Sequence, residues 1–289
     1  MHRRYTVVMI ETPIKENDAG QRLDKYLQKA FPQMPKSLMY KAIRNKKIKV
    51  NRKRCEISQK LVPGDTVQIF LPPDLLAPRE FVPEDKPLTV VYEDENYLVA
   101  DKPAGLLSQK DEAGPQDNLN WRIQSYLYRT GQWDPHSDRS FVPAAAHRLD
   151  RNTSGLVIIG KNAQSARHIS RLIREGKMTK EYVALAEGIL TRPFSVSLYL
   201  KKDGTKALVS EEPLEGYVPA RMEVKPKKTV SGNTLCHIIM DTGRFHQIRA
   251  CLAYLGHPLA GDRKYGSRLE PPYQLRSVRI AFDDVDVTS

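Results

Sequence analysis

The most informative stretch of the sequence is a polar segment that leads into an apolar run, Ala146-His147-Arg148-Leu149-Asp150-Arg151-Asn152-Thr153-Ser154-Gly155-Leu156. The run Leu156–Ile159 is typical of a buried strand, so we expect Asp150 on the loop that enters it. Loops fixed to a rigid strand often carry catalytic groups, and Thr153-Ser154-Gly155 supplies turn geometry and backbone donors. From these residues alone, Asp150 is either a catalytic acid or a carboxylate that caps a turn or pairs with a neighbouring arginine.

The segments after this strand are predicted to form a helix and then a second strand. Asn162 is suited to cap a helix that ends near Gly176, since its side chain can accept a hydrogen bond from a free backbone N–H group. Residues 180–185 then alternate as a strand does, with Tyr182 and Ala184 on one face and the residues between them on the other. The predicted order after Asp150 is thus strand, helix and strand.

A third polar cluster precedes a helix closer to the C-terminus. This helix is predicted to end at Gly256, because Pro258 prevents its continuation. Its inward stripe, at helical spacing, consists of Ile248, Cys251, Leu252 and Leu255. Its start carries four polar side chains, Arg244, His246, Gln247 and Arg249. The cluster is either ordinary surface or, with the free N–H groups and positive dipole end of the helix, a site for a carboxylate or a phosphate.

The composition indicates a polyanionic partner. The chain has 46 lysines and arginines against 34 aspartates and glutamates, a formal net charge of +12. Such an excess attracts nucleic acid first. A membrane surface is the weaker candidate, since no apolar run is long enough to span a bilayer. The first residues lack the apolar core of a signal peptide, so we expect a cytoplasmic protein.

The sequence provides no recognisable set of metal ligands. Cys55, Cys236 and Cys251 lie far apart and include no Cys-x-x-Cys pair, so we expect buried small side chains rather than disulfides or a zinc site. No glycine-rich phosphate loop followed by Lys-Ser or Lys-Thr occurs. We therefore expect no metal and no cofactor.

The N-terminal segment carries a basic run beside a predicted helix hairpin. Leu23, Tyr26, Leu27 and Ala30 recur at helical spacing, a second helix starts at 35–37, and short strands are expected over 48–50 and 66–70. The basic run consists of Lys46, Lys47, Lys49, Arg52, Lys53 and Arg54. Such a run is often only a solvated face, but a hairpin that presents it beside short strands is also typical of a compact RNA-binding module.

A proline-rich, charged stretch divides the chain. Its length of 289 residues suggests two domains. The prolines between Pro72 and Pro87 cannot continue a helix or a central strand. We therefore predict a small N-terminal α/β RNA-binding domain over 12–73, a linker over 74–87 and a second domain over 88–289.

Both predicted domains resemble known families. Residues 17–71 resemble the RNA-binding domain named after ribosomal protein S-four, through Gln21-Arg22-Leu23-Asp24, Pro35-Lys36-Ser37 and Leu61-Val62-Pro63-Gly64-Asp65. Residues 88–266 resemble the RluA/RluD family of pseudouridine synthases, through His147-Arg148-Leu149-Asp150 and Gly243-Arg244-Phe245-His246-Gln247-Ile248-Arg249, in that order. This resemblance implies an α+β catalytic domain built on a mixed, mostly antiparallel sheet. It also implies a cofactor-free enzyme that isomerises uridine to pseudouridine in RNA, most often large-subunit (23S) ribosomal RNA.

The resemblance also implies roles for individual residues. Asp150 is the nucleophile, Arg249 is the cation that favours its charged form, and Tyr182 packs against the base. Arg148 takes up the space that the flipped nucleotide leaves, and His147 orders the loop or the RNA backbone. Ile248 forms a wall of the pocket. The remaining residues expected to bind substrate or RNA are Thr153, Arg244, Gln247 and the basic run named above. We expect the protein to act as a monomer.

The chain departs from the family pattern at a few positions. Ser108-Gln109-Lys110 stands where many relatives carry a His-Pro pair, Arg276-Ser277 replaces a Leu-His-Ala type sequence, and the chain ends before the usual C-terminal extension. Two other classes are weighed against the isomerase. One is a non-catalytic RNA-binding or ribosome-assembly factor on the same scaffold. The other is a carboxylate nuclease or glycosidase, which would release fragments or free uracil. Intact Asp150, Tyr182 and Arg249 favour the isomerase.

Overall fold

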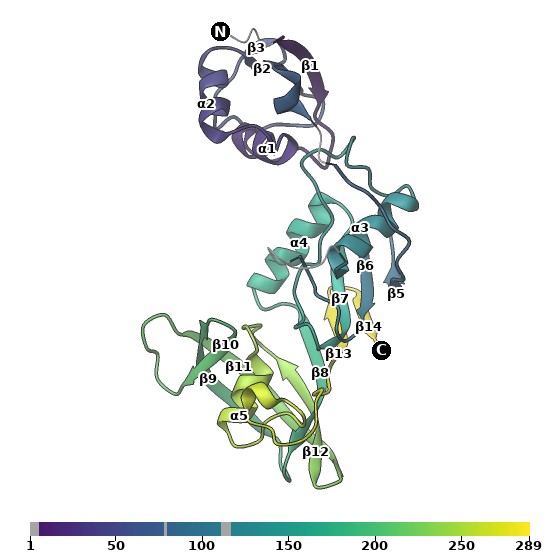
Figure 1. Cartoon of the computed structure of the whole chain (residues 1–289), viewed down its shortest axis with the longest axis vertical. Coiled ribbons are helices and arrows are strands. Elements are labelled where there is room, and N and C mark those ends of the chain that lie inside the picture. The colour runs from purple at the N-terminus through teal and green to yellow at the C-terminus, as the bar shows by residue number, and fades with distance from the viewer. Residues whose placement is uncertain (1–5, 78–79, 111–116) are drawn as a thin grey trace. The chain divides into compact units, whose positions relative to one another are not determined.

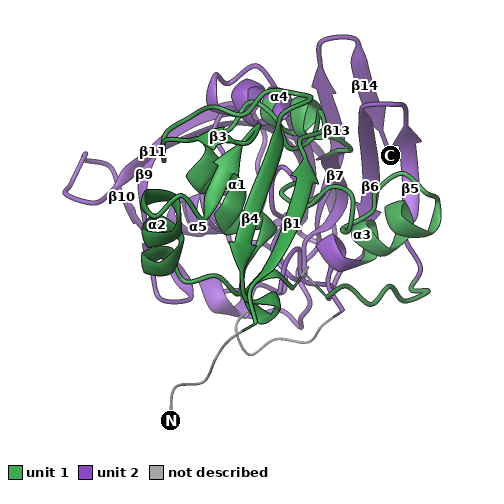
Figure 2. Cartoon of the chain, turned by 90° about the horizontal axis from the view of Figure 1, so that it is seen from above, with its two compact units in different colours: residues 1–86, 122–144, 160–167 green, residues 87–121, 145–159, 168–289 purple. Residues whose placement is uncertain are grey.

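The computed structural model describes residues 6–77, 80–110 and 117–289. The chain divides into two compact units, which Figure 2 shows in green and purple. Unit 1 consists of residues 1–86, 122–144 and 160–167, and unit 2 of residues 87–121, 145–159 and 168–289. Neither unit is continuous in sequence, because the chain passes between them several times.

Unit 1 contains a four-stranded sheet in the order β1-β4-β2-β3, in which each neighbouring pair is antiparallel. Its elements are β1 (Val8–Pro13), α1 (Leu23–Ala30), α2 (Lys36–Arg44), β2 (Ile48–Val50), β3 (Lys53–Arg54), β4 (Thr66–Leu71) and the 3-10 helix η1 (Pro73–Leu76). The helix hairpin and the strands over 48–50 and 66–71 confirm the prediction. Strand β1 was not predicted.

The core of unit 1 is formed by the stripe that the spacing predicted. Leu23, Tyr26, Leu27 and Ala30 are all buried and pack in one hydrophobic cluster with residues of β2 and β4. Segment 122–144 is attached to this module by polar contacts. The backbone N–H and the hydroxyl of Ser140 donate to Asp18 Oδ1 at 2.8 and 2.5 Å, and Gln21 Nε2 donates to Ser140 Oγ at 2.6 Å. These bonds join Ser140 of this segment to the N-terminal module within unit 1.

Unit 2 is built on a ten-stranded sheet in the order β10-β9-β11-β12-β8-β13-β7-β6-β5, with β14 paired to β13. Its strands are β5 (Thr89–Glu93), β6 (Tyr97–Lys102), β7 (Ser154–Gly160), β8 (Thr179–Glu187), β9 (Phe194–Asp203), β10 (Lys206–Ser210), β11 (Val218–Val230), β12 (Asn233–Met240), β13 (Leu275–Phe282) and β14 (Val285–Thr288). Most pairs are antiparallel and β13 runs parallel to β7. The predicted α+β class and mixed, mostly antiparallel sheet are confirmed.

Strand β7, which follows the Asp150 loop, lies inside the sheet between β13 and β6. In Figure 1, β13 from the yellow end of the chain lies beside it. Leu156, Val157, Ile158 and Ile159 are fully buried. Gly155 adopts a φ of 107°, and a Cβ there would lie 2.1 Å from the carbonyl oxygen of Ser277. Glycine is therefore required where β7 and β13 approach each other.

The remaining helical elements of the described residues are α3 (Leu119–Arg129), α4 (Ala163–Arg174), α5 (Gln247–Tyr254) and the 3-10 helix η2 (Arg263–Tyr265). The predicted cap of α4 is confirmed, since Ser165 N donates to Asn162 Oδ1 at 2.8 Å. In α5, Ile248, Cys251 and Leu252 are buried as predicted. The inward position predicted for Leu255 is wrong: the helix ends at Tyr254, and Leu255 is the C-terminal cap and 40% exposed.

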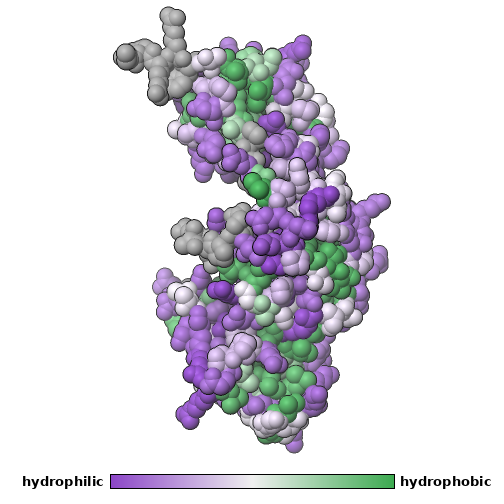
Figure 3. Space-filling view, turned by 45° about the vertical axis from the view of Figure 1, so that its right-hand side comes forward, coloured by the Kyte–Doolittle hydropathy of each residue, from purple (hydrophilic) through white to green (hydrophobic). Residues whose placement is uncertain are grey.

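The surface agrees with the charged composition. Figure 3 shows one face of the molecule, where hydrophilic residues predominate and hydrophobic ones form scattered groups. Within the part of the chain that the structure describes, no helix has the length and apolar character needed to cross a membrane. Cys55, Cys236 and Cys251 are free and buried, as predicted.

Candidate active site

A cleft of about 1530 Å³ opens in unit 2 beside the loop that carries Asp150. Among the described residues that line it, ten are lysines or arginines and four are acids. The cations are Arg148, Arg151, Arg174, Lys180, Lys202, Arg221, Arg244, Arg249, Arg263 and Lys264, and the acids are Asp150, Glu175, Asp241 and Asp262. A concave site with this charge suits a polyanion.

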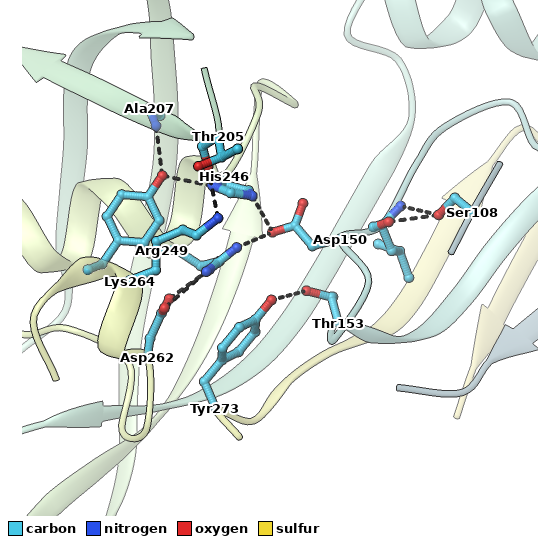
Figure 4. A network of polar contacts seen from close by, with 12 residues as sticks. Ser108, Asp150, Thr153, Thr205, Ala207, His246, Arg249, Asp262, Lys264 and Tyr273 are labelled. Carbon is cyan, nitrogen blue, oxygen red and sulfur yellow. Dashed lines mark hydrogen bonds and ion pairs between the residues drawn. The ribbon is translucent and has the colours of Figure 1, made fainter. Parts of the chain in front are cut away.

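Asp150 lies at the centre of a charged network (Figure 4). Its Oδ2 accepts a hydrogen bond of 3.0 Å from Arg249 Nη1, although the two residues are 99 positions apart in the chain. The other edge of the Arg249 guanidinium is held by Asp262, with Nε–Oδ2 at 2.7 Å and Nη2–Oδ1 at 3.0 Å. The side chains of Arg249 and Asp262 are 7% and 2% exposed, whereas that of Asp150 is 24% exposed. The network therefore fixes a carboxylate that still faces the cleft.

His246 contacts the same oxygen of Asp150. Its Nε2 lies 3.6 Å from Asp150 Oδ2, and its Nδ1 lies 2.8 Å from the hydroxyl of Tyr265, which accepts a 2.7 Å hydrogen bond from Ala207 N. Burial lowers the pKa of His246 to about 4, so the ring is neutral at neutral pH. The tautomer with its proton on Nε2 gives each of these atoms a complementary partner. His246 also has a φ of 52°, a conformation that surrounding contacts must hold in place.

Aromatic rings enclose the network. The guanidinium carbon of Arg249 lies 4.4 Å from the ring centroid of Tyr273 and 5.1 Å from that of Tyr265, distances typical of cation–π contacts. Tyr182 lines the cleft on β8 and is 7% exposed, and its burial raises the pKa of its hydroxyl to about 12. Tyr182 and Ala184 lie on the buried face of β8, which confirms the predicted alternation.

The loop that carries Asp150 is held from several directions. Ser108, at the first position of departure from the family pattern, donates to Leu149 O at 2.7 Å and accepts from Leu149 N at 3.1 Å. Lys102 is fully buried and donates to the carbonyl oxygens of Pro103, Leu106 and Arg151. Burial lowers the pKa of Lys102 to about 8. These bonds fix the backbone on both sides of Asp150.

The remaining polar residues predicted around the site differ in their surroundings. Arg148 lines the cleft, is exposed and makes no hydrogen bond or ion pair with another described residue. His147 is half-buried; its Nε2 accepts a long hydrogen bond of 3.4 Å from Ile158 N, and burial lowers its pKa to about 3. Thr153 is buried and its hydroxyl shares a 3.5 Å hydrogen bond with that of Tyr273.

Two predicted residues on α5 lie behind the cleft. Gln247 accepts hydrogen bonds from Arg244 N and Thr242 Oγ1 and donates to Arg221 O, so it shapes the turn before the helix. Ile248 is buried and is not among the described residues that line the cleft. Ile248 and Arg249 are adjacent on α5, and adjacent residues of a helix point in different directions. The role of Ile248 as a wall of the pocket stays a prediction.

The comparisons with known proteins agree with this geometry. Residues 96–254 match the family model described as RNA pseudouridylate synthase, and residues 21–67 match the S4 domain. The chain belongs to this synthase family. Ribosomal large subunit pseudouridine synthase D of Escherichia coli O157:H7 is 30% identical over 268 residues, which cover 92% of this chain and 78% of the relative. The protein of the same name from Salmonella typhimurium is 31% identical over 269 residues, which cover the same shares.

Solved structures support the fold of this pseudouridine synthase. Human RNA pseudouridylate synthase domain containing 4 has a TM-score of 0.58 at 17% identity, over 70% of this chain and 87% of that chain. Human RNA pseudouridylate synthase domain containing 1 has a TM-score of 0.56 at 22% identity, over 73% of this chain and 86% of that chain.

Three residues of the pseudouridine synthase site were not predicted from the sequence. Asp262, Tyr265 and Tyr273 all follow the region that matches the family model. The only signal for them is the Gly261-Asp262 pair and the Tyr265-Gly266 pair after the helix, which indicate turns without indicating partners. No group of three or more His, Cys, Asp or Glu side chains in the described part of the synthase is arranged to hold a metal ion.

The predicted basic run lies in unit 1. Lys46, Lys47, Arg52, Lys53 and Arg54 are exposed. Lys49 is half-buried, with its ammonium 5.6 Å from the ring centroid of Phe70. The basic run begins just after the C-terminal end of α2 and includes β3. Its positive charges therefore lie at the end of that helix and on the hairpin that β2 and β3 form.

Proposed function

We propose that this pseudouridine synthase isomerises specific uridines of large-subunit ribosomal RNA, with Asp150 as its nucleophile. The observation that carries the proposal is the carboxylate of Asp150, which faces a cation-lined cleft while Arg249 and His246 hold one of its oxygens. The substrate is proposed from the names of relatives such as ribosomal large subunit pseudouridine synthase D and from the S4 domain. The net charge of +12 agrees with an RNA substrate.

The chemistry needs a carboxylate that acts on the ribose. The glycosidic bond between C1′ of the sugar and N1 of uracil breaks, the uracil turns, and its C5 bonds to C1′. The proton that C5 then loses is balanced by a proton that N1 gains, so no atom is gained or lost. Asp150 serves either of two routes: it adds to C1′ and is later displaced, or it abstracts a sugar proton to give a glycal. In both routes Asp150 must keep one oxygen free, and the contacts described above engage only Oδ2.

Arg249 and Tyr182 prepare the site for this step. Arg249 is held by Asp262 on one edge and donates to Asp150 with the other, so the position of the carboxylate is set before the substrate arrives. We propose that Tyr182 packs against the uracil and retains it while its bond to the sugar is broken. Little of the Tyr182 side chain is exposed to water, and a reactive sugar intermediate requires that water be kept away.

The uridine must leave its helix to reach Asp150, because a stacked base is out of reach. Flipping costs a few kcal/mol, which contacts to the displaced strand must offset. We propose that Arg148 supplies such a contact by taking up the vacated space or pairing with a phosphate. Its exposure and its lack of a partner in the described structure leave the guanidinium available.

The basic run of unit 1 is proposed to hold the RNA through its backbone. The side chains of Lys46, Lys47, Arg52, Lys53 and Arg54 are exposed, so they can neutralise phosphates without breaking bonds within the fold. Contacts of this kind add affinity and orient the RNA, whereas they carry little sequence information. The choice of uridine is thus left to the cleft in unit 2.

The experiment that tests the proposal maps pseudouridines in large-subunit ribosomal RNA from cells that lack the chain. Cells restored with the wild type should regain one or more specific pseudouridines, and cells restored with Asp150→Asn should not. Asp241→Asn is the matched control, since Asp241 is an exposed acid of the same cleft. If the wild type restores no site in this RNA, the proposed substrate is wrong. If Asp150→Asn restores the sites, the proposed nucleophile is wrong.

A further inference from the structure

Phe245 is an exposed aromatic side chain on the lining of the cleft. It is 37% exposed, whereas Tyr182 and Tyr273, which line the same cleft, are each 7% exposed. The part of an aromatic ring that stays in contact with water does not stabilise the folded state. On a surface rich in cations, such a ring is suited to contact a nucleobase, which has a flat π face of its own.

The packing of Phe245 places it next to the reacting group without touching it. Its ring stacks on the imidazole of His246, with centroids 3.8 Å apart and planes at 19°. His246 in turn places Nε2 3.6 Å from Asp150 Oδ2. His246 thus contacts both Phe245 and Asp150, so a nucleotide next to the uridine that reacts is the one expected to meet the Phe245 ring.

The charges around Phe245 match a nucleotide. Lys202 Nζ lies 5.1 Å from the ring centroid, on a lysine that is exposed and can move. Arg244 also lines the cleft and donates through Nε to Pro219 O, which holds its guanidinium beside the turn. The face of the Phe245 ring can contact a base, and the cations Lys202 and Arg244 beside it can contact the phosphate that follows that base.

We propose that Phe245 stacks on the base of a nucleotide adjacent to the target uridine, and so helps to hold the RNA strand in the cleft. The proposal rests on the proposed function, since it needs a flipped uridine at Asp150. The imidazole of His246 already covers one face of the Phe245 ring, so the base stacks on the other face and displaces the Lys202 ammonium that lies over the ring. In this stack the base contacts Phe245, Phe245 contacts His246, and His246 Nε2 lies 3.6 Å from Asp150 Oδ2.

The position of Phe245 in the chain indicates a role in choosing RNA rather than in chemistry. It lies between Arg244 and His246, in a turn that the side chain of Gln247 organises through Arg244 N. The turn is held by hydrogen bonds that do not involve the Phe245 side chain, such as that from Arg244 N to Gln247 Oε1. The turn itself therefore does not require a phenyl ring at this position. A purine gives a larger stacking surface than a pyrimidine, so the ring favours a purine in the adjacent position.

The test uses a short RNA around a uridine that the wild-type chain modifies, in whichever RNA mapping finds it. Three versions are made: the parent, one abasic on the 5′ side of the uridine, and one abasic on the 3′ side. Single-turnover pseudouridine formation is followed against enzyme concentration for the wild type, Phe245→Leu, Phe245→Trp and Tyr254→Leu. Tyr254 is the control because it is exposed on α5 and is not among the described residues that line the cleft.

On the parent RNA, Phe245→Leu should raise the enzyme concentration for half-maximal rate by about 5- to 150-fold, the range for loss of one stacked base. The rate at saturating enzyme should stay near that of the wild type. Phe245→Trp and Tyr254→Leu should behave like the wild type. With one of the abasic RNAs the wild type should show the same loss, and Phe245→Leu should add nothing to it.

An equal loss for Phe245→Leu on all three RNAs would overturn the proposal, because the effect would not depend on a base. No loss on the parent RNA, or a lower rate at saturation, would overturn it as well. These outcomes are distinct from failure of the proposed function. If mapping finds the uridine outside large-subunit ribosomal RNA, the proposed substrate fails, and the comparison of the three RNAs still decides the role of Phe245.

Discussion

Replacing Asp262 by asparagine should destabilise the protein and loosen the active site. The carboxylate of Asp262 accepts from both Nε and Nη2 of Arg249, at 2.7 and 3.0 Å. An amide of the same shape can accept only one of these bonds, and it turns its own N–H donors toward the other. Arg249 would then keep one charged partner, Asp150, at 3.0 Å.

The size of the effect follows from burial. Arg249 and Asp262 are 7% and 2% exposed, so water cannot replace the missing bond. Breaking a buried ion pair by removing one partner costs about 3–5 kcal/mol, and the remaining contact with Asp150 favours the low end, about 3 kcal/mol. For domains of 150–250 residues this lowers the melting temperature by about 6–12 °C.

The assay is thermal unfolding followed by near-ultraviolet circular dichroism, with urea titration for the free energy of unfolding. Asp286→Asn is the control, since Asp286 forms a bidentate pair with Arg279 at the surface, where water replaces the broken bonds, and should change the melting temperature little. Pseudouridine formation by Asp262→Asn at a temperature where it is folded should also fall, because Arg249 no longer sets the position of Asp150. If Asp262→Asn melts like Asp286→Asn, the reasoning about the buried pair is refuted.

Three further predictions concern pH, structure and RNA binding. Burial lowers the pKa of His246 to about 4 in the folded protein, whereas in the unfolded chain it is about 6.5. Between these two pH values the unfolded chain binds a proton that the folded protein does not. As the pH falls from 6.5 to 4, His246 should therefore lower the free energy of unfolding by about 1.4 kcal/mol per pH unit. His246→Gln should remove one proton from that uptake in potentiometric titration, and unchanged uptake would contradict the assignment. Lys102→Met should leave three carbonyl oxygens without their shared donor and cost about 2–4 kcal/mol in urea unfolding, whereas a wild-type midpoint would show that the bonds matter little. Replacing the exposed members of the basic run by glutamine should flatten the salt dependence of RNA affinity by about one unit of slope for each phosphate that is no longer neutralised, and an unchanged slope would mean that they are only solvated surface.

Elements with strong periodic patterns were predictable from the sequence. The alternation in β8 places Tyr182 and Ala184 on one face, and Asn162 caps α4, because both features depend on side chains close together in the chain. Leu255 shows where such patterns fail. Helical spacing continues through it, but the helix stops one residue earlier at a C-terminal cap, and spacing alone does not locate that end.

Long-range partners were harder to predict. The pairing of Arg249 with Asp262 depends on how a loop returns to a helix, and nothing in the local sequence of Gly261-Asp262 indicates which cation it meets. Strand β1 was missed although its residues alternate in burial, with Val8, Ile10 and Thr12 less exposed than the residues between them. The resemblance to a family predicted Asp150, Tyr182 and Arg249 as site residues. The residues that contact Arg249, namely Asp262, Tyr265 and Tyr273, could be identified only in the folded structure.

The measurement that tests the central claim most directly is single-turnover pseudouridine formation by Asp150→Asn, with RNA affinity determined on the same preparation. We predict a rate at least about 1,000-fold below the wild type, as for loss of an enzymic nucleophile, with RNA affinity retained. A rate close to that of Asp241→Asn, in RNA that both variants bind, would contradict the account.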